Sequence, residues 1–394
     1  MIDLLYSDVE EQLRASVRSL LADRSPWSQV LKRAETSDTY DAELWHALAA
    51  DLGLAALLIP ESYGGVGATA REAGVVLEEI GRAVAPVPYL GSAVVATTAL
   101  AYCGDAELLS ALASGRHTAV LATPFTRHGP SIATVREVAS TEGGAVVDAP
   151  GSSVGAPSLV VSTDGSTDEP GRLTGRVSSV ADALPADTLL VPTADGLYAV
   201  DARAEGVTVA PVVSLDLTRQ LADITLDGAV GRRVANAATA TAAIDAALLV
   251  GAALLASEQV GIAVWCVEST VDYLKTRFQF GRLLGSYQAL KHRVADMWVD
   301  ATQARAVARY AADCLAADSD DAPVATAMAQ AFVGPAAVRI AEECLQLHGG
   351  IGFTWEYPIH LYLKRAKSDS LAYGNAAAHR SDLARLVDIP APQS

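Results

Sequence analysis

The sequence has few of the residues that build metal sites or bind anionic polymers. Cysteine occurs only four times in 394 residues, and the four positions lie tens of residues apart, without the spacing of zinc ligands. This usage is typical of reduced thiols, so we expect a cytoplasmic protein without a metal site. Basic residues are also scarce, because 29 Lys and Arg face 46 Asp and Glu. The resulting net charge of −17 argues against nucleic acid or an anionic membrane as the main partner.

Leader and membrane-spanning patterns are missing as well. The first residues contain no basic stretch followed by an apolar run, so they predict no signal peptide. The apolar stretch at residues 246–256 is shorter than the ~20 residues that cross a bilayer, so we expect no membrane span. Hydrophobic residue types nevertheless make up 51% of the chain, which is enough for the cores of two or three packed domains.

The residue pattern divides the chain into three regions, of which the first is helical. Ser7 and Glu10 have the spacing of a capping box, and apolar residues then recur at helical intervals. A second helical pattern ends at Gly53, and a third follows the glycine-rich turn at residues 64–67. Residues 1–115 are therefore predicted to form an N-terminal α-helical domain.

The second and third regions differ in their turn signals. Residues 116–236 predict a middle β-domain, a barrel or sandwich, with a mobile loop at 162–171. Its short apolar runs are at residues 119–122, 145–147, 159–161, 189–191, 197–200 and 207–209. From residue 237 the turn signals disappear and Ala-rich helical periodicity takes over. Residues 237–394 are therefore predicted to form a C-terminal helical bundle.

A basic and aromatic turn lies between two long helical patterns at residues 273–288. Arg277 offers a guanidinium fork for phosphate oxygens, Phe280 a flat apolar surface, and Gly281 a close approach of the backbone. The alternative interpretation is a helix–helix corner with a solvated arginine.

A glycine-rich segment follows at residues 346–367. Gly349, Gly350 and Gly352 could expose backbone amides to a pyrophosphate, or could simply terminate a helix. Glu356 has the chemistry of a general base, but it also suits a solvated loop. A basic group at residues 364–367 is most simply interpreted as the solvated face of a helix.

Together, and in this order after a helical and a β region, the two segments resemble the acyl-CoA dehydrogenase family over nearly the whole chain, including the turn at residues 59–65. The resemblance implies a multidomain α+β fold: an N-terminal helical domain, a middle β-barrel or sandwich and a C-terminal four-helix bundle. It also implies a dimer of dimers with FAD at the subunit interfaces. In the implied reaction a base takes a proton from the α-carbon of an acyl-CoA, and a hydride passes from the β-carbon to FAD. Electron-transferring flavoprotein is the expected acceptor.

The resemblance separates two sets of flavin contacts. Those that reach the FAD of a neighbouring subunit are retained, at Arg277, Phe278, Gln279, Phe280, Tyr287, Gln288, Gln346, Gly349 and Gly350. Those to the chain's own flavin are altered. Residues 121–127 lack the family's glutamate and Gly-Ser pair, and residues 175–180 lack its aromatic side chain.

The resemblance also shows that the usual catalytic base is missing. One family position for the glutamate falls on Tyr373, and the other falls on Gly251. Tyrosine is a poor base at neutral pH, since its pKa is ~10. Glu258 lies seven residues beyond Gly251, on the same face of a helix, and is the candidate substitute.

This chain keeps the contacts to a neighbour's flavin and loses those to its own flavin. In this pattern it resembles the partner subunits of heterotetrameric bacterial acyl-CoA dehydrogenases that act on steroid side-chain CoA esters. The first hypothesis is therefore an α2β2 assembly with a paralogous subunit that carries the base, in fatty acid or steroid degradation. A second is a self-sufficient homotetramer with an atypical base. A third is a structural or acyl-CoA-binding subunit without enzyme activity.

Overall fold

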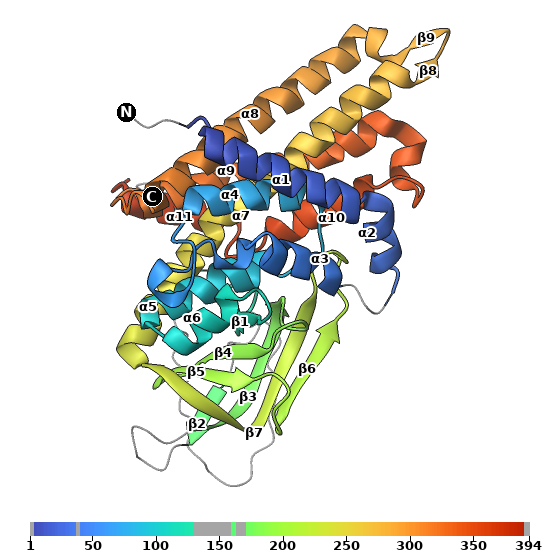
Figure 1. Ribbon diagram of the computed structural model, residues 1–394. Helices are drawn as coiled ribbons and strands as arrows, with labels where there is room; N and C mark the ends of the chain where they lie inside the picture. The colour runs from blue at the N-terminus through green and yellow to red at the C-terminus, as the bar shows by residue number, and fades with distance from the viewer. Residues whose placement is uncertain (1–3, 37–39, 129–158, 163–170, 390–394) are drawn as a thin grey trace, which may run out of the picture.

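The structure is a computed structural model that describes residues 4–36, 40–128, 159–162 and 171–389 (Figure 1). Its N-terminal region is helical, as predicted. The capping box is present, because the Ser7 amide donates to Glu10 Oε2 at 2.7 Å and the Glu10 amide donates to Ser7 Oγ at 3.3 Å. The helices are α1 (Asp8–Arg24), α2 (Trp27–Ala34), α3 (Ala42–His46), α4 (Ala70–Ala83), α5 (Thr97–Cys103) and α6 (Ala106–Ala113).

The middle region is a strongly curled sheet. Its order is β1-β4-β5-β7-β3-β2, and β6 also pairs with β7. Only β1 and β4 pair in parallel among the strands that the structure describes. The strands are β1 (Ala119–Leu121), β2 (Leu159–Ser162), β3 (Gly171–Ala181), β4 (Thr188–Pro192), β5 (Gly196–Asp201), β6 (Val207–Val212) and β7 (Leu221–Asn236).

Most of the predicted apolar runs coincide with strands, but none of them falls on β3 or on β7, the longest strand. The run at 145–147 lies outside the described residues, as does most of the loop predicted at 162–171. β7 was not predicted because its glycines and paired arginines look like turn signals. One of these glycines is needed for packing, because a Cβ at Gly231 would lie 2.7 Å from Leu173 Cδ1.

The C-terminal region is the predicted helical bundle. The helices are α7 (Ala237–Thr276), α8 (Gln288–Ala316), α9 (Ala322–His348), α10 (Ile359–Asp369) and α11 (Ala376–Leu386). Helices α7, α8 and α9 pack on one another, and α11 packs on α9. A short hairpin of β8 (Phe278–Gln279) and β9 (Arg282–Leu283) joins α7 to α8 and projects from the end of the bundle farthest from the sheet (Figure 1).

The apolar helix around residues 246–256 is longer than the sequence pattern predicted. By length and composition alone, α7 and the helical segment Ala322–Phe353 could each cross a membrane. However, 56% and 67% of their most apolar windows are buried inside the protein, as in the core helices of a bundle.

The first region and the bundle share a tightly packed contact between α4 and α7. Gly81 lies against the carbonyl of Glu258, and Gly261 lies against the carbonyl of Glu78, so a Cβ at either glycine would collide with the backbone.

The boundaries between the three regions follow from the changes in secondary structure. The last helix of the first region ends at Ala113 and the first strand begins at Ala119, while the last long strand ends at Asn236 and α7 begins at Ala237. We propose residues 115/116 and 236/237 as the domain boundaries.

Candidate functional site

The hairpin at the end of the bundle presents aromatic side chains to solvent. Phe280 and Gly281 form its turn with φ of 50° and 78°, the left-handed backbone that a two-residue hairpin turn requires. The Phe280 side chain is 91% exposed and that of Phe278 is 57% exposed. Arg277 and Gln279 are also exposed. Aromatic surface of this kind on a projecting hairpin is typical of an interface.

The glycine-rich segment presents an open backbone at the end of α9. Helix α9 ends at His348, and Gly349 follows with φ of 63°. A Cβ added at Gly349 or Gly350 would meet nothing within 4 Å, so a ligand could approach their amides. Gly352 has a different role, because its Cβ would lie 2.7 Å from the Leu345 carbonyl oxygen. Two of the three predicted glycines are therefore open, and the third allows the turn to close.

A stack of aromatic rings joins these two segments. The rings of Tyr273 on α7 and His348 on α9 are stacked at 4.4 Å between centroids, and Tyr357 packs on His348 at 5.0 Å. His348 Nδ1 donates to the Cys344 carbonyl at 2.7 Å, which fixes the ring. Arg277 lies one helical turn beyond Tyr273, and its amide donates to the Tyr273 carbonyl. The end of α7, which precedes Arg277, therefore lies close to the end of α9, which precedes Gly349.

The two usual positions of the base converge on one point in the interior. A Cβ at Gly251 would lie 3.3 Å from Cζ of Tyr373, so the tyrosine ring covers the glycine. Tyr373 is 7% exposed, and burial raises the pKa of its phenol well above the usual value. The phenol therefore stays protonated at neutral pH and cannot act as a base.

The segment that follows β1 packs directly on Tyr373. The Tyr373 amide donates to the Phe125 carbonyl at 2.9 Å, and the two rings meet edge to face at 5.5 Å. The guanidinium of Arg219 lies over the Phe125 ring, 5.1 Å from its centroid. Phe125 is 4% exposed, so this contact is part of the protein interior.

Glu258, the candidate substitute base, is held in a buried ion-pair network. Arg219 Nη2 donates to its two carboxylate oxygens at 2.6 and 2.7 Å, and Arg365 Nε donates to Oε1 at 2.7 Å. Burial alone raises the pKa of Glu258, but the two guanidinium groups outweigh it and hold the pKa below the usual range. These contacts weigh against Glu258 as a base, and that role stays a prediction.

The buried network also corrects one interpretation of the sequence. Arg365 was expected on a solvated helix face, but it is 1% exposed, on the inner side of α10. Its partners come from three separate elements, because Asp216 precedes β7, Glu258 lies on α7 and Asp369 ends α10. Asp369 lies four residues beyond Arg365 on the same helix, but no sequence spacing connects Arg365 to Asp216 or Glu258. The signals available in the sequence were the carboxylate of Asp369 at i+4 and the apolar neighbours of Arg365 at helical intervals.

Comparison with known proteins agrees with this architecture. The family models "Acyl-CoA dehydrogenase, N-terminal domain" and "Acyl-CoA dehydrogenase, C-terminal domain" match residues 7–116 and 240–387. The chain belongs to the acyl-CoA dehydrogenase family. It is 34% identical to the acyl-CoA dehydrogenase IpdE2 of Mycolicibacterium smegmatis, over 93% of this chain and 95% of that protein. It is thus a member of an oxidoreductase family whose enzymes typically bind FAD.

Two solved acyl-CoA dehydrogenase assemblies share the fold over almost the full length. A variant of the Tcur3481–Tcur3483 steroid acyl-CoA dehydrogenase superimposes with a TM-score of 0.79 at 28% identity, over 97% of this chain and 98% of that one. The ChsE4–ChsE5 complex of Mycobacterium tuberculosis gives 0.81 at 26% identity, over 99% and 100%. Both are similar to this chain in architecture as well as in sequence.

The two sides of the candidate acyl-CoA dehydrogenase site differ in their fit to FAD. The exposed Arg277, the flat surface of Phe280 and the open amides of Gly349 and Gly350 fit an extended phosphate-bearing cofactor. On the other side, Phe125 and Tyr373 touch each other through backbone and ring, so their positions do not fit a flavin ring between them.

Proposed function

We propose that this chain is a subunit of a heteromeric acyl-CoA dehydrogenase that completes the FAD site of a paralogous subunit and does not supply the base. The observation that carries this proposal is the contrast between two surfaces. The residues expected to serve a neighbour's FAD are exposed, apart from the partly buried Tyr287, and lie at or beyond the ends of α7 and α9. The positions expected to serve the chain's own FAD and substrate are filled by Tyr373 and Phe125.

In this assembly the end of the bundle binds a cofactor held mainly by the partner. The Arg277 guanidinium would pair with its phosphate oxygens, and the amides of Gly349 and Gly350 would donate to them. Phe280 would cover an apolar part of the cofactor. When bound, FAD supplies the hydride acceptor of the reaction. The proton from the substrate α-carbon passes to a carboxylate of the partner, because Tyr373 and Gly251 offer none.

The similar assemblies support both the pairing and the class of substrate. The Tcur3481–Tcur3483 protein is a steroid acyl-CoA dehydrogenase. The second structure is a complex of two different proteins, ChsE4 and ChsE5. We therefore infer an α2β2 complex that acts on an acyl-CoA with a steroid-derived acyl group. Electron-transferring flavoprotein as the acceptor and a cytoplasmic location stay predictions of the family resemblance and the cysteine usage.

Two alternatives give different results in the same experiment. A self-sufficient homotetramer would carry one FAD per chain and would turn over acyl-CoA alone, with Glu258 as its base. A structural or acyl-CoA-binding subunit would bind no flavin even in the complex. The buried ion pairs of Glu258 weigh against the first, and the exposed aromatic and arginine groups of the hairpin weigh against the second.

The deciding experiment is co-expression with a paralogue that carries glutamate at the family's base position. We expect the purified complex to be yellow and active, with fewer flavins than chains, and the chain alone to be nearly colourless and inactive. FAD absorbance per chain and acyl-CoA turnover with an artificial electron acceptor measure both properties. A yellow, active protein made of this chain alone would contradict the proposal.

A further inference from the structure

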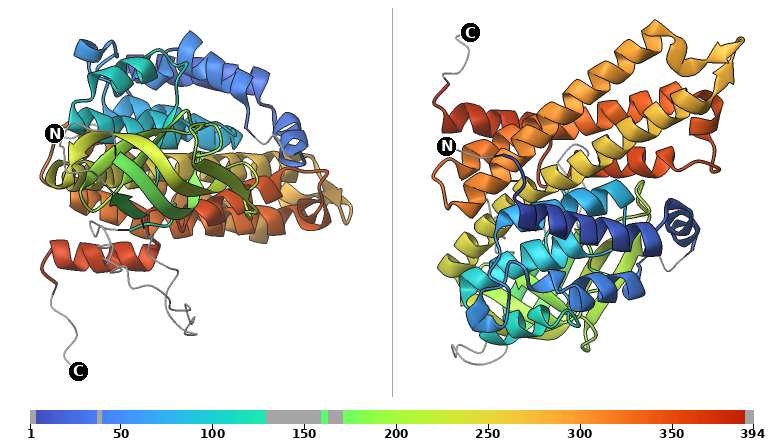
Figure 2. Two further views of the ribbon diagram at one scale, coloured as in Figure 1. Left: turned by 90° about the horizontal axis from the view of Figure 1, so that it is seen from below. Right: turned by 45° about the horizontal axis from the view of Figure 1, so that its top comes forward.

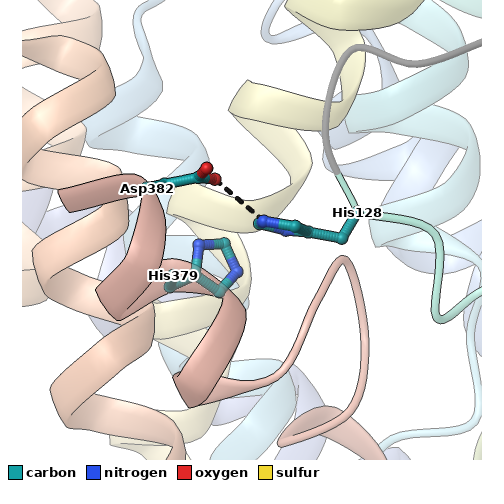
Figure 3. Close-up of side chains that lie close together, drawn as sticks. All are labelled: His128, His379 and Asp382. Atoms are coloured by element: carbon teal, nitrogen blue, oxygen red, sulfur yellow. Dashed lines mark ion pairs between the residues drawn. The ribbon is translucent and has the colours of Figure 1, made fainter. Parts of the chain in front are cut away.

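A cluster of metal-ligating side chains lies beneath Tyr373, outside the flavin contacts. His128 belongs to the segment after β1, while His379 and Asp382 lie three residues apart on one face of α11 (Figure 3). One ligand atom from each residue lies within 4.8 Å of the other two. Helix α11 lies on the side of the bundle opposite the N-terminal helices, so the cluster connects the outermost helix to the rest of the protein (Figure 2).

Both imidazole rings are oriented by one backbone carbonyl. His128 Nδ1 donates to the Tyr373 carbonyl at 3.0 Å, and His379 Nε2 donates to the same oxygen at 3.1 Å. A carbonyl oxygen has two lone pairs and can accept both bonds. This assignment leaves His128 Nε2 and His379 Nδ1 as the nitrogens that can coordinate. A second nitrogen bonded to a carbonyl is the usual arrangement around metal-ligating histidines.

The remaining groups already converge. His128 Nε2 lies 2.8 Å from Asp382 Oδ2, and the two imidazole rings are 4.6 Å apart at 78° to each other. The backbone allows this approach only because residue 374 is glycine, since a Cβ there would collide with the His128 ring. Gly374 has φ of 102°, which other residues rarely adopt. The approach of His128 to α11 is therefore specified by the local sequence.

The chemistry of the cluster suits a metal ion. His379 is 4% exposed, and its ring is held between the Tyr373 carbonyl and the His128 ring. Asp382 adds a partly exposed carboxylate. Two imidazoles and one carboxylate are ligands that zinc and related divalent ions accept, with further coordination positions left for water.

A cavity beside the cluster provides that space. It has a volume of about 290 Å³ and is bordered by all three residues, by Leu248 and Ala252 on α7 and by α9. An ion bound by the three side chains would therefore keep an open coordination position toward the cavity. Sites with three protein ligands and one open position are typical of zinc ions that exchange ligands.

We propose that His128, His379 and Asp382 form a three-ligand site for a divalent transition-metal ion, with zinc as the ion that matches them best. The bound ion would tie α11 to the segment after β1, directly behind Tyr373. The cysteine spacing predicted no metal, but these ligands come from segments far apart in the sequence. Without an ion, His128 and Asp382 pair directly, with Nε2 2.8 Å from Oδ2.

The test is metal binding by the full chain, which depends on neither flavin nor turnover. Chain freed of metal by a chelator is equilibrated with Zn²⁺, desalted and analysed for metal content, and Co²⁺ is titrated with visible absorption as the readout. We expect about one ion per chain and a d–d absorption band for Co²⁺. Zn²⁺ should also raise the thermal midpoint of unfolding, because it binds the folded state.

Variants identify the ligands. His379→Gln and Asp382→Asn should each weaken Zn²⁺ binding by at least ~10-fold, since even changes next to metal ligands cost 10–100-fold. His292→Gln, at an exposed position on α8, is the matched control and should bind as the parent does. Asp382 is partly exposed, so Asp382→Asn keeps the test valid if His379→Gln does not fold. Less than about a tenth of an ion per chain, or unchanged binding in both variants, would overturn the proposal.

Discussion

At the end of the bundle the Phe280 side chain is 91% exposed, whereas Tyr373 in the interior is 7% exposed. The family resemblance places the first residue at the flavin and the second at the base position beside the substrate. The exposed apolar area of Phe280 contributes no hydrophobic stabilisation until another surface covers it. The second already packs on Phe125 and covers Gly251. On the proposed function, one half of the site is open to a partner and the other half is closed by the protein's own side chains.

The largest expected effect is a loss of stability when the Glu258 carboxylate is removed from its buried ion-pair network. Glu258→Ala should lower the free energy of unfolding by about 3–5 kcal/mol, because it leaves the buried Arg219 and Arg365 without their shared partner. Denaturant unfolding measures this loss. Glu107→Ala, at a side chain that is 84% exposed, is the control and should change little. Unchanged stability together with lost turnover would instead support Glu258 as the base.

The second prediction concerns removal of the buried Tyr373 ring from the closed half of the site. Tyr373→Ala should cost about 3 kcal/mol of unfolding free energy, because it removes a buried ring from Phe125 and from the surface over Gly251. Turnover of the complex with the partner should persist below the unfolding temperature. Tyr373→Phe keeps the ring and should stay close to the parent in both measurements. Loss of turnover in Tyr373→Phe would show that the phenol takes part in the reaction.

The third prediction concerns the open half. Arg277→Ala should weaken FAD binding in the complex by about 2 kcal/mol, roughly 30-fold, which is the contribution of a charge-assisted hydrogen bond to phosphate. Flavin release during dilution, followed by fluorescence, measures the change. Arg116→Ala removes another exposed arginine, in the turn before β1, and should leave FAD retention unaltered. Equal retention in both variants would mean that the hairpin does not contact the cofactor.

The smallest effect is a pH dependence near the open half. Burial, and then the charge of Lys364, lower the pKa of His360 to about 4, against 6.5 in the unfolded chain. Between these values the unfolded chain binds more protons, so this contribution to stability is lost as pH falls from 6.5 to about 4. His360→Gln should flatten that part of the unfolding profile. An identical slope in parent and variant would assign the dependence to other groups.

The parts of the fold that follow local rules were predictable. The capping box at Ser7, the left-handed Gly53 and most of the short strands depend on neighbours in the sequence, and the structure contains them. Strand β7 was missed because its glycines are needed for contacts with other strands, such as Leu173 on β3. The inward position of Arg365 was missed because its partners come from other elements.

The amino-acid sequence alone predicts the order of helical, β and helical regions, the family resemblance and, through that resemblance, the lack of a carboxylate at both expected base positions. These features are set by residue identity and by local periodicity. Packing in three dimensions places Tyr373 over Gly251 and against Phe125, holds Glu258 between two arginines and brings His128 to α11. Each depends on packing between segments distant in the chain, where backbone approach and burial, rather than spacing, fix which side chains meet.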